Sequence, residues 1–309
     1  DTRSVAGIFR ALRNIPLMLD ICRDIEEICP DAVLLNYTNP MGMLCSAMQK
    51  YTSVNITGLC HSVVNTADML ARWIEAPIEE IDYTCAGVNH QAFYLEFKWN
   101  GKDAYPLLRD KMREPQILNE EQVRNEIFQQ FGYYVTESSG HSSEYCAWFR
   151  KRRDLIEKYC THGTGWNPGE HAFAVNNRIK REKTLYEDID KWLQEEEIDL
   201  ESSGEYAAHI FNAIFGDRKP FVFNGNVINE GCITNLPKEA CVEIPMLATR
   251  DGLKKIFVGK LPDNIAILVN TTAQIENLVV EACMEKDKEK VINAVQMDPL
   301  CSAVCSLQE

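Results

Sequence analysis

The chain has 309 residues, 45% of them hydrophobic and 25% charged, so it is long enough to bury a large core as one large or two modest domains. Its 32 Lys and Arg are outnumbered by 46 Asp and Glu, which gives a net charge of -14. Such a chain lacks the basic surface that nucleic acids and anionic membranes attract. We therefore expect no nucleic acid and no membrane as partners, but small molecules or other subunits.

The twelve Cys residues lie mostly inside apolar, periodic segments of a large chain, which is typical of buried free thiols and not of a disulfide framework. Examples are Cys22, Cys29, Cys45, Cys283, Cys301 and Cys305. No apolar run approaches the roughly 18 residues of a membrane-spanning helix, and no signal segment is visible. These features predict a cytoplasmic protein.

The first eighty residues alternate between helical and extended patterns. Apolar residues spaced by three and four predict a helix from Val5 to Cys29, which we expect Pro16 to kink or interrupt. The next elements predicted are a strand at 32–37, a helix at 41–51, a strand at 55–59 and a helix at 62–75. This order implies parallel strands joined by right-handed crossovers, the second half of a doubly wound sheet.

The pattern changes after Pro77, so we place a domain boundary near residue 80. A β-type run at 83–99 ends in Asn100-Gly101, a hairpin signal that predicts an antiparallel sheet. The remaining expectations are helices at 107–131, 154–159, 204–215 and 264–305, a charged helical region up to about 200, and a strand at 221–227. The polar segment FGYYVTESSGHSSEY at 131–145 is predicted to be a site loop.

Polar residues follow the first two predicted strands at the point where each strand ends. Asn36 and Asn39 follow one strand and Cys60-His61 the other, and open α/β sheets bind ligands at such ends. The two side-chain amides could form hydrogen bonds with the hydroxyl groups of a sugar or of a nicotinamide ribose. Asn before Pro is also common in turns, and taken alone these residues favour a turn.

A thiol and two imidazoles are the other candidates for chemistry. The thiolate of Cys60 and the imidazole of His90 are metal ligands that suit zinc best, and two protein ligands would leave coordination positions open for a substrate. Their spacing in the sequence alone, however, favours a buried thiol and a core histidine without a metal. His61 has the residue type of a general acid or base. No GxGxxG turn occurs in the sequence, so the part of a dinucleotide fold that binds pyrophosphate is not in this chain.

The succession of motifs is NYTNP, GLCHS, GVNHQAFYLEF, GYYVTESSGHSSEY, FNGNVINEG and CVEIPMLATRDG. It resembles glycoside hydrolase family 4, most closely the α-galactosidase branch, over nearly the whole chain. The resemblance implies a lactate/malate dehydrogenase-like α/β fold. Residues 1–80 would form the C-terminal half of a NAD-binding, Rossmann-like domain. Residues 81–309 would form an α+β domain for substrate, metal and oligomerisation, with a mainly helical C-terminus.

The resemblance also implies a mechanism. NAD would take hydride from C3 of an α-galactoside, and a Mn²⁺ ion held by Cys60 and His90 would chelate the oxygens on C2 and C3. A base, implied to be Tyr134, would remove the C2 proton, and His61 would act as the acid for the leaving group. Water would then add, and hydride would return.

Further site residues follow from the same resemblance. Asn39 would contact both substrate and cofactor, with Asn36 beside the same pocket. Glu137 and His141, in the loop 137–144, would bind the sugar and set specificity. The family also implies a homodimer or a homotetramer.

The chain departs from the family in lacking roughly the first hundred residues, which carry the Gly-rich turn and the ribose-binding acid of a dinucleotide fold. We expect either the greater part of a NAD- and Mn²⁺-dependent α-galactosidase or a truncated, non-catalytic homologue that serves as a binding module. A further alternative is an α-galacturonidase or α-glucosidase of the same family.

Overall fold

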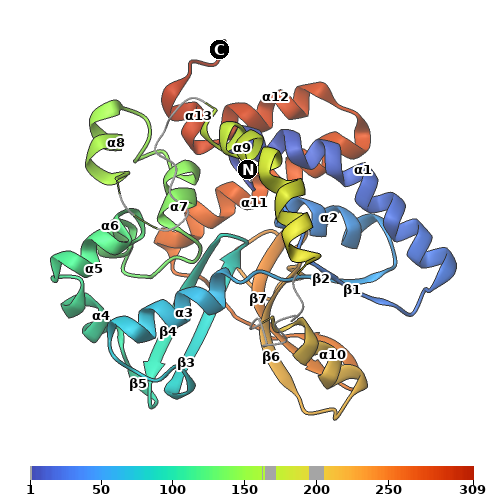
Figure 1. Ribbon diagram of the computed structural model, residues 1–309, viewed down its shortest axis with the longest axis horizontal. Helices are drawn as coiled ribbons and strands as arrows, with labels where there is room; N and C mark the ends of the chain where they lie inside the picture. Colours follow the sequence, from blue (N-terminus) through green and yellow to red (C-terminus); the bar gives the residue numbers. More distant parts are fainter. Residues whose placement is uncertain (1, 162, 164–171, 195–204) are drawn as a thin grey trace.

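The computed structural model describes residues 2–161, 163, 172–194 and 205–309 (Figure 1). The strands are β1 (Val33–Asn36), β2 (Asn55–Gly58), β3 (Ile81–Val88), β4 (Gln91–Trp99), β5 (Lys102–Asp103), β6 (Phe221–Ile228), β7 (Cys241–Thr249) and β8 (Gly252–Lys255). The longer helices are α1 (Ser4–Ile28), α2 (Met41–Tyr51), α3 (Ser62–Trp73), α6 (Gln122–Phe131), α9 (Phe173–Trp192), α10 (Ala207–Phe215), α11 (Asp263–Glu285) and α12 (Lys288–Met297). The short ones are η1 (Ile78–Glu80), α4 (Tyr105–Lys111), α5 (Pro115–Glu120), α7 (Ser139–Tyr145), α8 (Arg153–Tyr159) and α13 (Pro299–Val304). Within these ranges, no helix has the length and apolar character needed to cross a membrane.

All eight described strands belong to one mixed sheet of order β1-β2-β6-β7-β3-β4-β5, with β8 paired to β7. Strands β1 and β2 are parallel, and the other pairs are antiparallel. Both predictions of strand direction are therefore confirmed, and so is the hairpin at Asn100-Gly101, which joins β4 to β5. The sheet runs on from β2 through β6 and β7 into β3, and the domain boundary near residue 80 stays a prediction.

One transverse row of residues joins the two parts of the sheet. Gly58 of β2 pairs with Asn226 of β6, Asn226 pairs with Glu243 of β7, and Glu243 pairs with Gly87 of β3. The Asn226 amide donates to the Gly58 carbonyl at 3.3 Å and to the Glu243 carboxyl at 3.4 Å. A Cβ on Gly58 would lie 2.9 Å from the Asn226 Cβ, so only glycine permits this close pairing.

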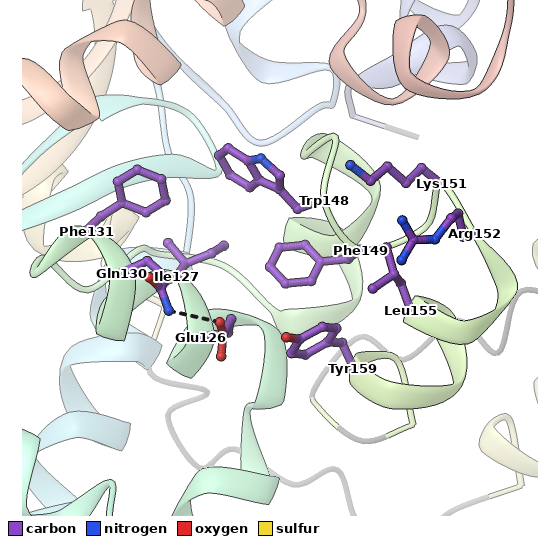
Figure 2. Close-up of a pocket in the computed structure, with 10 residues that line it drawn as sticks. All are labelled: Glu126, Ile127, Gln130, Phe131, Trp148, Phe149, Lys151, Arg152, Leu155 and Tyr159. Carbon is purple, nitrogen blue, oxygen red and sulfur yellow. Dashed lines mark hydrogen bonds between the residues drawn. The ribbon is translucent and has the colours of Figure 1, made fainter.

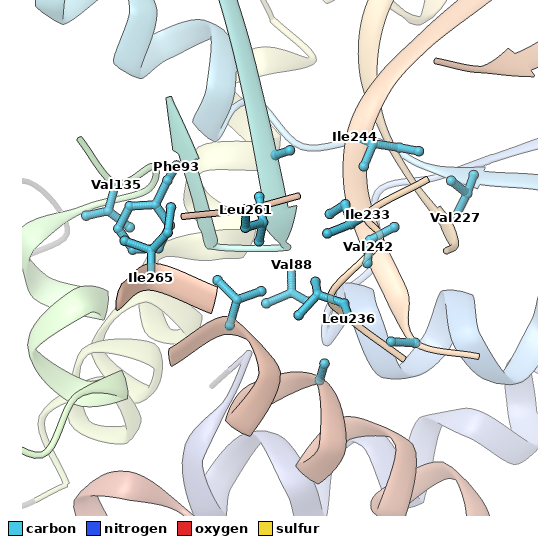
Figure 3. Close-up of a cluster of buried hydrophobic side chains, with 14 of the residues drawn as sticks. Val88, Phe93, Val135, Val227, Ile233, Leu236, Val242, Ile244, Leu261 and Ile265 are labelled. Carbon is cyan, nitrogen blue, oxygen red and sulfur yellow. The ribbon is translucent and has the colours of Figure 1, made fainter. Parts of the chain in front are cut away.

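Helices cover the sheet and bury three apolar clusters. Helices α1, α2 and α11 pack around β2, where Ile15, Leu44 and Val280 are fully buried. Helices α3, α4 and α6 pack against β3 and β4. The largest cluster lies between β3, β6 and β7 and helices α10 and α11, with the side chains of Val88, Val242, Ile244 and Ile265 shown in Figure 3.

The structure corrects several predicted elements. Pro16 does not interrupt α1. Its side chain is exposed, and the buried side chains of Ile15 and Leu19, before and after it, pack the helix against the core. The predicted helix at 107–131 is three helices, of which α5 begins at Pro115, where a proline suits the first turn. The predicted loop at 131–145 contains α7.

Two other expectations are met in part. The charged helical region is α9, which ends at Trp192, and its predicted end near 200 lies outside the described residues. All twelve Cys are free thiols, as predicted, but Cys29 and Cys305 are exposed and only half of the twelve are buried.

A buried ion pair links α6 to α7. Arg124 Nε lies 3.0 Å from Glu121 Oε2, with both side chains at most 2% exposed, and the same oxygen accepts the Ser139 amide at 3.0 Å. We expect Arg124→Met to lower the free energy of unfolding by about 3–5 kcal/mol, because it removes the guanidinium that pairs with the buried Glu121 carboxylate. Urea denaturation measures the change. Arg113→Met, in the exposed pair with Asp110, is the control and should change it by less than about 1 kcal/mol.

Candidate active site

The thiol of Cys60 and the imidazole of His90 meet at the edge of the sheet. Cys60 lies two residues beyond Gly58 of β2, and His90 lies in the turn between β3 and β4, with a left-handed φ of 60°. Cys60 Sγ is 3.3 Å from His90 Nε2, and His90 Nδ1 is 3.1 Å from Thr2 Oγ1. The predicted pair is therefore brought together, with Nε2 turned toward sulfur and Nδ1 held by a hydroxyl group.

This pair has the chemistry and spacing of two ligands of one cation. Ligands at about 2.0–2.3 Å from a metal lie roughly 3–3.7 Å from each other, and the Sγ to Nε2 distance of 3.3 Å falls in that range. Burial lowers the pKa of His90 to about 3, so its ring is neutral and has a lone pair to donate. Burial, followed by the charge of Glu243, raises the pKa of Cys60 to about 12, so a cation must displace the thiol proton on binding.

A second group of donors faces the same place from the start of α7. His90, Glu137 and His141 offer ligand atoms that all lie within 4.8 Å of one another. His141 Nδ1 is 2.6 Å from Glu137 Oε2, and the His141 ring stacks on the His90 ring at 5.7 Å. Burial would raise the pKa of Glu137, but the hydrogen bond from His141 and the nearby histidines outweigh it and lower the pKa to about 2.

The backbone at Glu137 supports a functional role for this group. Its φ of 79° is left-handed, which non-glycine residues seldom adopt, and such conformations cluster at functional sites. Ser138 then caps α7 by accepting the His141 amide at 3.2 Å. The cap fixes His141 one turn along the helix, where it meets the carboxylate.

These groups open into a polar cavity of about 620 Å³, large enough for a sugar. Its lining includes Asn39, Cys60, His61, His90, Glu137 and His141, together with Arg10, Arg72 and Arg124. Six of the eight predicted site residues thus line one cavity. Asn39 Oδ1 also accepts the Met41 amide at 3.2 Å, which holds it at the start of α2.

His61 lies at the rim of the cavity and pairs with a carboxylate that the sequence did not suggest. Its Nε2 is 2.9 Å from Glu205 Oε2, and its ring stacks on Tyr37 at 5.3 Å. Hydrogen bonds from His61 and Tyr37 hold the pKa of Glu205 below its ordinary value. The Tyr206 hydroxyl bonds to both the amide and the carbonyl of Cys60, which fixes the backbone beside His61.

Asn36 and Tyr134, the other two predicted residues, do not line the cavity. The buried Asn36 amide donates to Thr38 O at 3.0 Å and accepts Thr38 N at 3.1 Å, so it shapes the turn. Tyr134 is fully buried, and its hydroxyl donates to Asn125 Oδ1 at 3.0 Å. The structure thus places both side chains outside the cavity, and the roles expected for them stay predictions.

Tyr145 is the aromatic residue that sequence reasoning missed. Its ring stacks on His141 at 5.7 Å, and its hydroxyl bonds to Thr2 Oγ1. It follows His141 by four residues, so a helix predicted over this segment would have placed the two rings on one face.

A second pocket, of about 510 Å³, lies between α6 and α8 (Figure 2). Four of its ten lining side chains are aromatic, namely Phe131, Trp148, Phe149 and Tyr159. The Gln130 amide donates to the Glu126 carboxylate at 3.1 Å in the same wall. None of the thiol and imidazole groups described above lines it. We therefore place the chemistry in the larger, polar cavity.

Comparisons with known proteins identify the family of this chain. The model for family 4 glycosyl hydrolases matches residues 1–76, and the model for the C-terminal domain of the same family matches residues 85–301. The chain belongs to glycosyl hydrolase family 4. It is thus a member of a family of glycoside hydrolases, as the motif order predicted.

Curated members of family 4 include α-galactosidases similar to this chain. One from Bacillus subtilis is 38% identical over all of this chain and 70% of its own length, and one from Rhizobium meliloti is 34% identical over all of this chain and 64% of its own length. An α-galacturonidase from Thermoanaerobacter italicus is 27% identical over 97% of this chain and 69% of its own length.

Solved structures bear out the predicted fold class. A 6-phospho-α-glucosidase from gut microorganisms, in complex with NAD and Mn²⁺, has a TM-score of 0.78 at 19% identity, over 97% of this chain and 70% of its own. A lactate dehydrogenase from a deep-sea metagenome has a TM-score of 0.52 at 14% identity, over 90% of this chain and 71% of its own. The family 4 chain therefore has the lactate dehydrogenase-like α/β fold.

We expect Cys60→Ser and His90→Ala each to weaken Mn²⁺ binding at least about tenfold, because each removes one of two ligands. Titration calorimetry with Mn²⁺ alone measures affinity, and circular dichroism checks that the fold is kept. Cys29→Ser, which changes an exposed thiol far along the chain from both ligands, is the control. Unchanged affinity in either site variant would remove that residue from the cation site.

Stability should also depend on Glu243, the carboxyl in the transverse row. Burial raises its pKa from 4.5 to about 7, although hydrogen bonds from Asn226 and Asn89 oppose this. Between these two values the native state keeps a proton that the unfolded state has lost, so the free energy of unfolding falls as the pH rises through this window. Glu243→Gln should make the fall between about pH 4.5 and 7 shallower in urea denaturation, and the buried Glu276, whose pKa is likewise raised to about 7, accounts for the remaining slope. Glu239→Gln, at an exposed site, should leave the fall unchanged.

Proposed function

We propose that this chain is the greater part of an α-galactosidase that depends on NAD and on a divalent cation such as Mn²⁺. The observation that carries the proposal is the Cys60–His90 pair, with its 3.3 Å approach, at the wall of a polar cavity of about 620 Å³. Similarity supports the sugar: the α-galactosidases are 34–38% identical to this chain, against 26–27% for the α-galacturonidases and the α-glucosidase.

Cys60 and His90 would hold the cation. When bound there, a divalent cation supplies Lewis-acid stabilisation of negative charge that develops on sugar oxygens. The dependence on NAD rests on the relatives, because the sequence has no Gly-rich turn to bind a dinucleotide's phosphates. Asn39, at the cavity wall, is the residue of this chain that we assign to both cofactor and sugar.

Two imidazole–carboxylate pairs would move protons. His61 is paired with Glu205 at the rim, where it is 41% exposed, so it can deliver a proton to a departing leaving group. His141 is paired with Glu137 deeper in the site. We assign it the role of base, because it lines the cavity, whereas the Tyr134 hydroxyl lies outside it and donates to Asn125. Glu137 orients the ring and contributes, with His141, to binding of the sugar hydroxyls.

The charges of the cavity favour a neutral sugar over a uronic acid. The guanidinium groups of Arg72 and Arg124 at its wall have carboxylate partners close by, Glu120 and Glu121. A compensated guanidinium attracts a substrate carboxylate less than a lone one does. This observation favours the galactoside over the galacturonide.

We expect the chain, supplied with NAD, Mn²⁺ and reductant, to hydrolyse p-nitrophenyl α-galactoside faster than the matching α-galacturonide and α-glucoside. EDTA or omission of NAD should abolish the reaction. His141→Asn should lower kcat about 100-fold or more, because it removes the proposed base. Release of p-nitrophenol measures each rate, with Cys29→Ser as the control variant.

Activity that survives both EDTA and removal of NAD would contradict the proposed mechanism. Faster hydrolysis of the galacturonide would instead support the alternative substrate. A chain that binds Mn²⁺ but hydrolyses none of the three glycosides would support the non-catalytic binding module.

A further inference from the structure

Two residues near the start of the chain hold the turn that carries His90. The side chain of Thr2 lies beside the imidazole, and its Oγ1 is 3.1 Å from Nδ1. The guanidinium of Arg3 donates to the Asn89 carbonyl and, at 3.3 Å, to Gln91 Oε1. Thr2 and Arg3 thus contact His90 and the residues on both sides of it, and we call these two residues the clamp.

The clamp is shielded from water and held by two helices. Thr2 and Arg3 are each 6% exposed, so water competes little for their hydrogen bonds. Arg3 Nε lies 3.5 Å from Glu276 Oε1 on α11. The Thr2 hydroxyl also bonds to the hydroxyl of Tyr145 on α7. Contacts from two helices that are far apart in the sequence therefore fix the position of the clamp.

The clamp favours one orientation of the His90 ring. In this orientation Nδ1 faces Thr2 and Nε2 lies 3.3 Å from Cys60 Sγ. Rotating the ring by half a turn would bring a carbon to the Thr2 hydroxyl and turn Nε2 away from the thiol. The left-handed φ of 60° at His90 also needs surrounding contacts to maintain it, and Arg3 supplies them through the neighbouring residues.

The Thr2 hydroxyl also suits the proton that His90 would carry with a cation on Nε2. A neutral imidazole has one N–H and one lone pair, so a cation on Nε2 leaves the proton on Nδ1. Thr2 Oγ1 can accept this N–H and donate its own proton to Tyr145. Removal of the hydroxyl would leave a buried N–H without this partner, which costs free energy.

We propose that Thr2, supported by Arg3, is a positioning residue that holds His90 with Nε2 toward Cys60 and Nδ1 toward a hydroxyl group. Neither residue of the clamp would bind the cation, and each would act through His90. The inference rests on the proposed function, because it takes His90 as a cation ligand. Partners of this kind fix the ring and the proton of a metal-ligating histidine.

Titration calorimetry of the chain with Mn²⁺ alone tests the effect on affinity. Thr2→Val should weaken binding at least about tenfold, and Thr2→Ser, which keeps the hydroxyl, should bind about as tightly as the unmodified chain. Thr136→Val is the matched control, because this threonine is also buried and its hydroxyl has no hydrogen-bond partner in the described part of the chain. Equal affinity of Thr2→Val and the control would overturn the proposal.

A second variant serves if circular dichroism shows that Thr2→Val does not fold. Tyr145→Phe removes the hydroxyl that Thr2 contacts and keeps the ring that stacks on His141. It should also weaken Mn²⁺ binding, because the Thr2 hydroxyl loses its acceptor when it accepts the His90 N–H. Unchanged affinity in Tyr145→Phe would contradict the proposal in that case.

The His90 ring gives a readout that needs no metal. In a chain labelled with ¹⁵N at histidine, multiple-bond ¹H–¹⁵N spectra report the state of each ring nitrogen, and the signals missing from His90→Ala identify this residue. Thr2→Val should shift the Nδ1 signal, whereas Thr136→Val should leave it in place. An unshifted signal in Thr2→Val would overturn the clamp. A shifted signal in a chain that binds no Mn²⁺ would support the clamp and contradict only the cation site of the proposed function.

Discussion

The position of the site depends on the row of four residues that crosses the sheet from Gly58 through Asn226 and Glu243 to Gly87. Cys60 follows one end of this row by two residues, and His90 follows the other end by three. Strand spacing is fixed by backbone hydrogen bonds, so the row sets how far apart the two functional residues lie. The position of the proposed cation site thus depends on two strands, β6 and β7, that would contribute neither of its ligands.

This construction explains which features the sequence could predict. The helices and strands up to Trp73 follow from local periodicity, and their parallel pairing follows from their alternation. Nothing local shows that β6 and β7, which come after residue 220, insert between β2 and β3. The meeting of Cys60 and His90 was therefore reached through the order of motifs, while their spacing alone favoured two unrelated core residues.

The two predicted site residues that lie outside the cavity have one feature in common. Asn36 and Tyr134 were chosen for their residue types beside a strand end and in a polar segment, but each satisfies its hydrogen bonds within the fold. The sequence shows which hydrogen-bond donors and acceptors a side chain has, but it does not show which neighbouring group they bind in the folded chain. Glu205 was not predicted as a site residue, because its partner His61 lies far away along the chain and no local pattern indicates the pair.

Burial of the Cys60 thiol also bears on oxidation. Thiolates, and not thiols, react readily with peroxides and disulfides, so a thiol whose pKa is raised to about 12 is slow to be oxidised. Cys29 and Cys305, which are exposed, meet an oxidant first. The burial that keeps the Cys60 thiol protonated would therefore also protect the sulfur that we propose as a cation ligand.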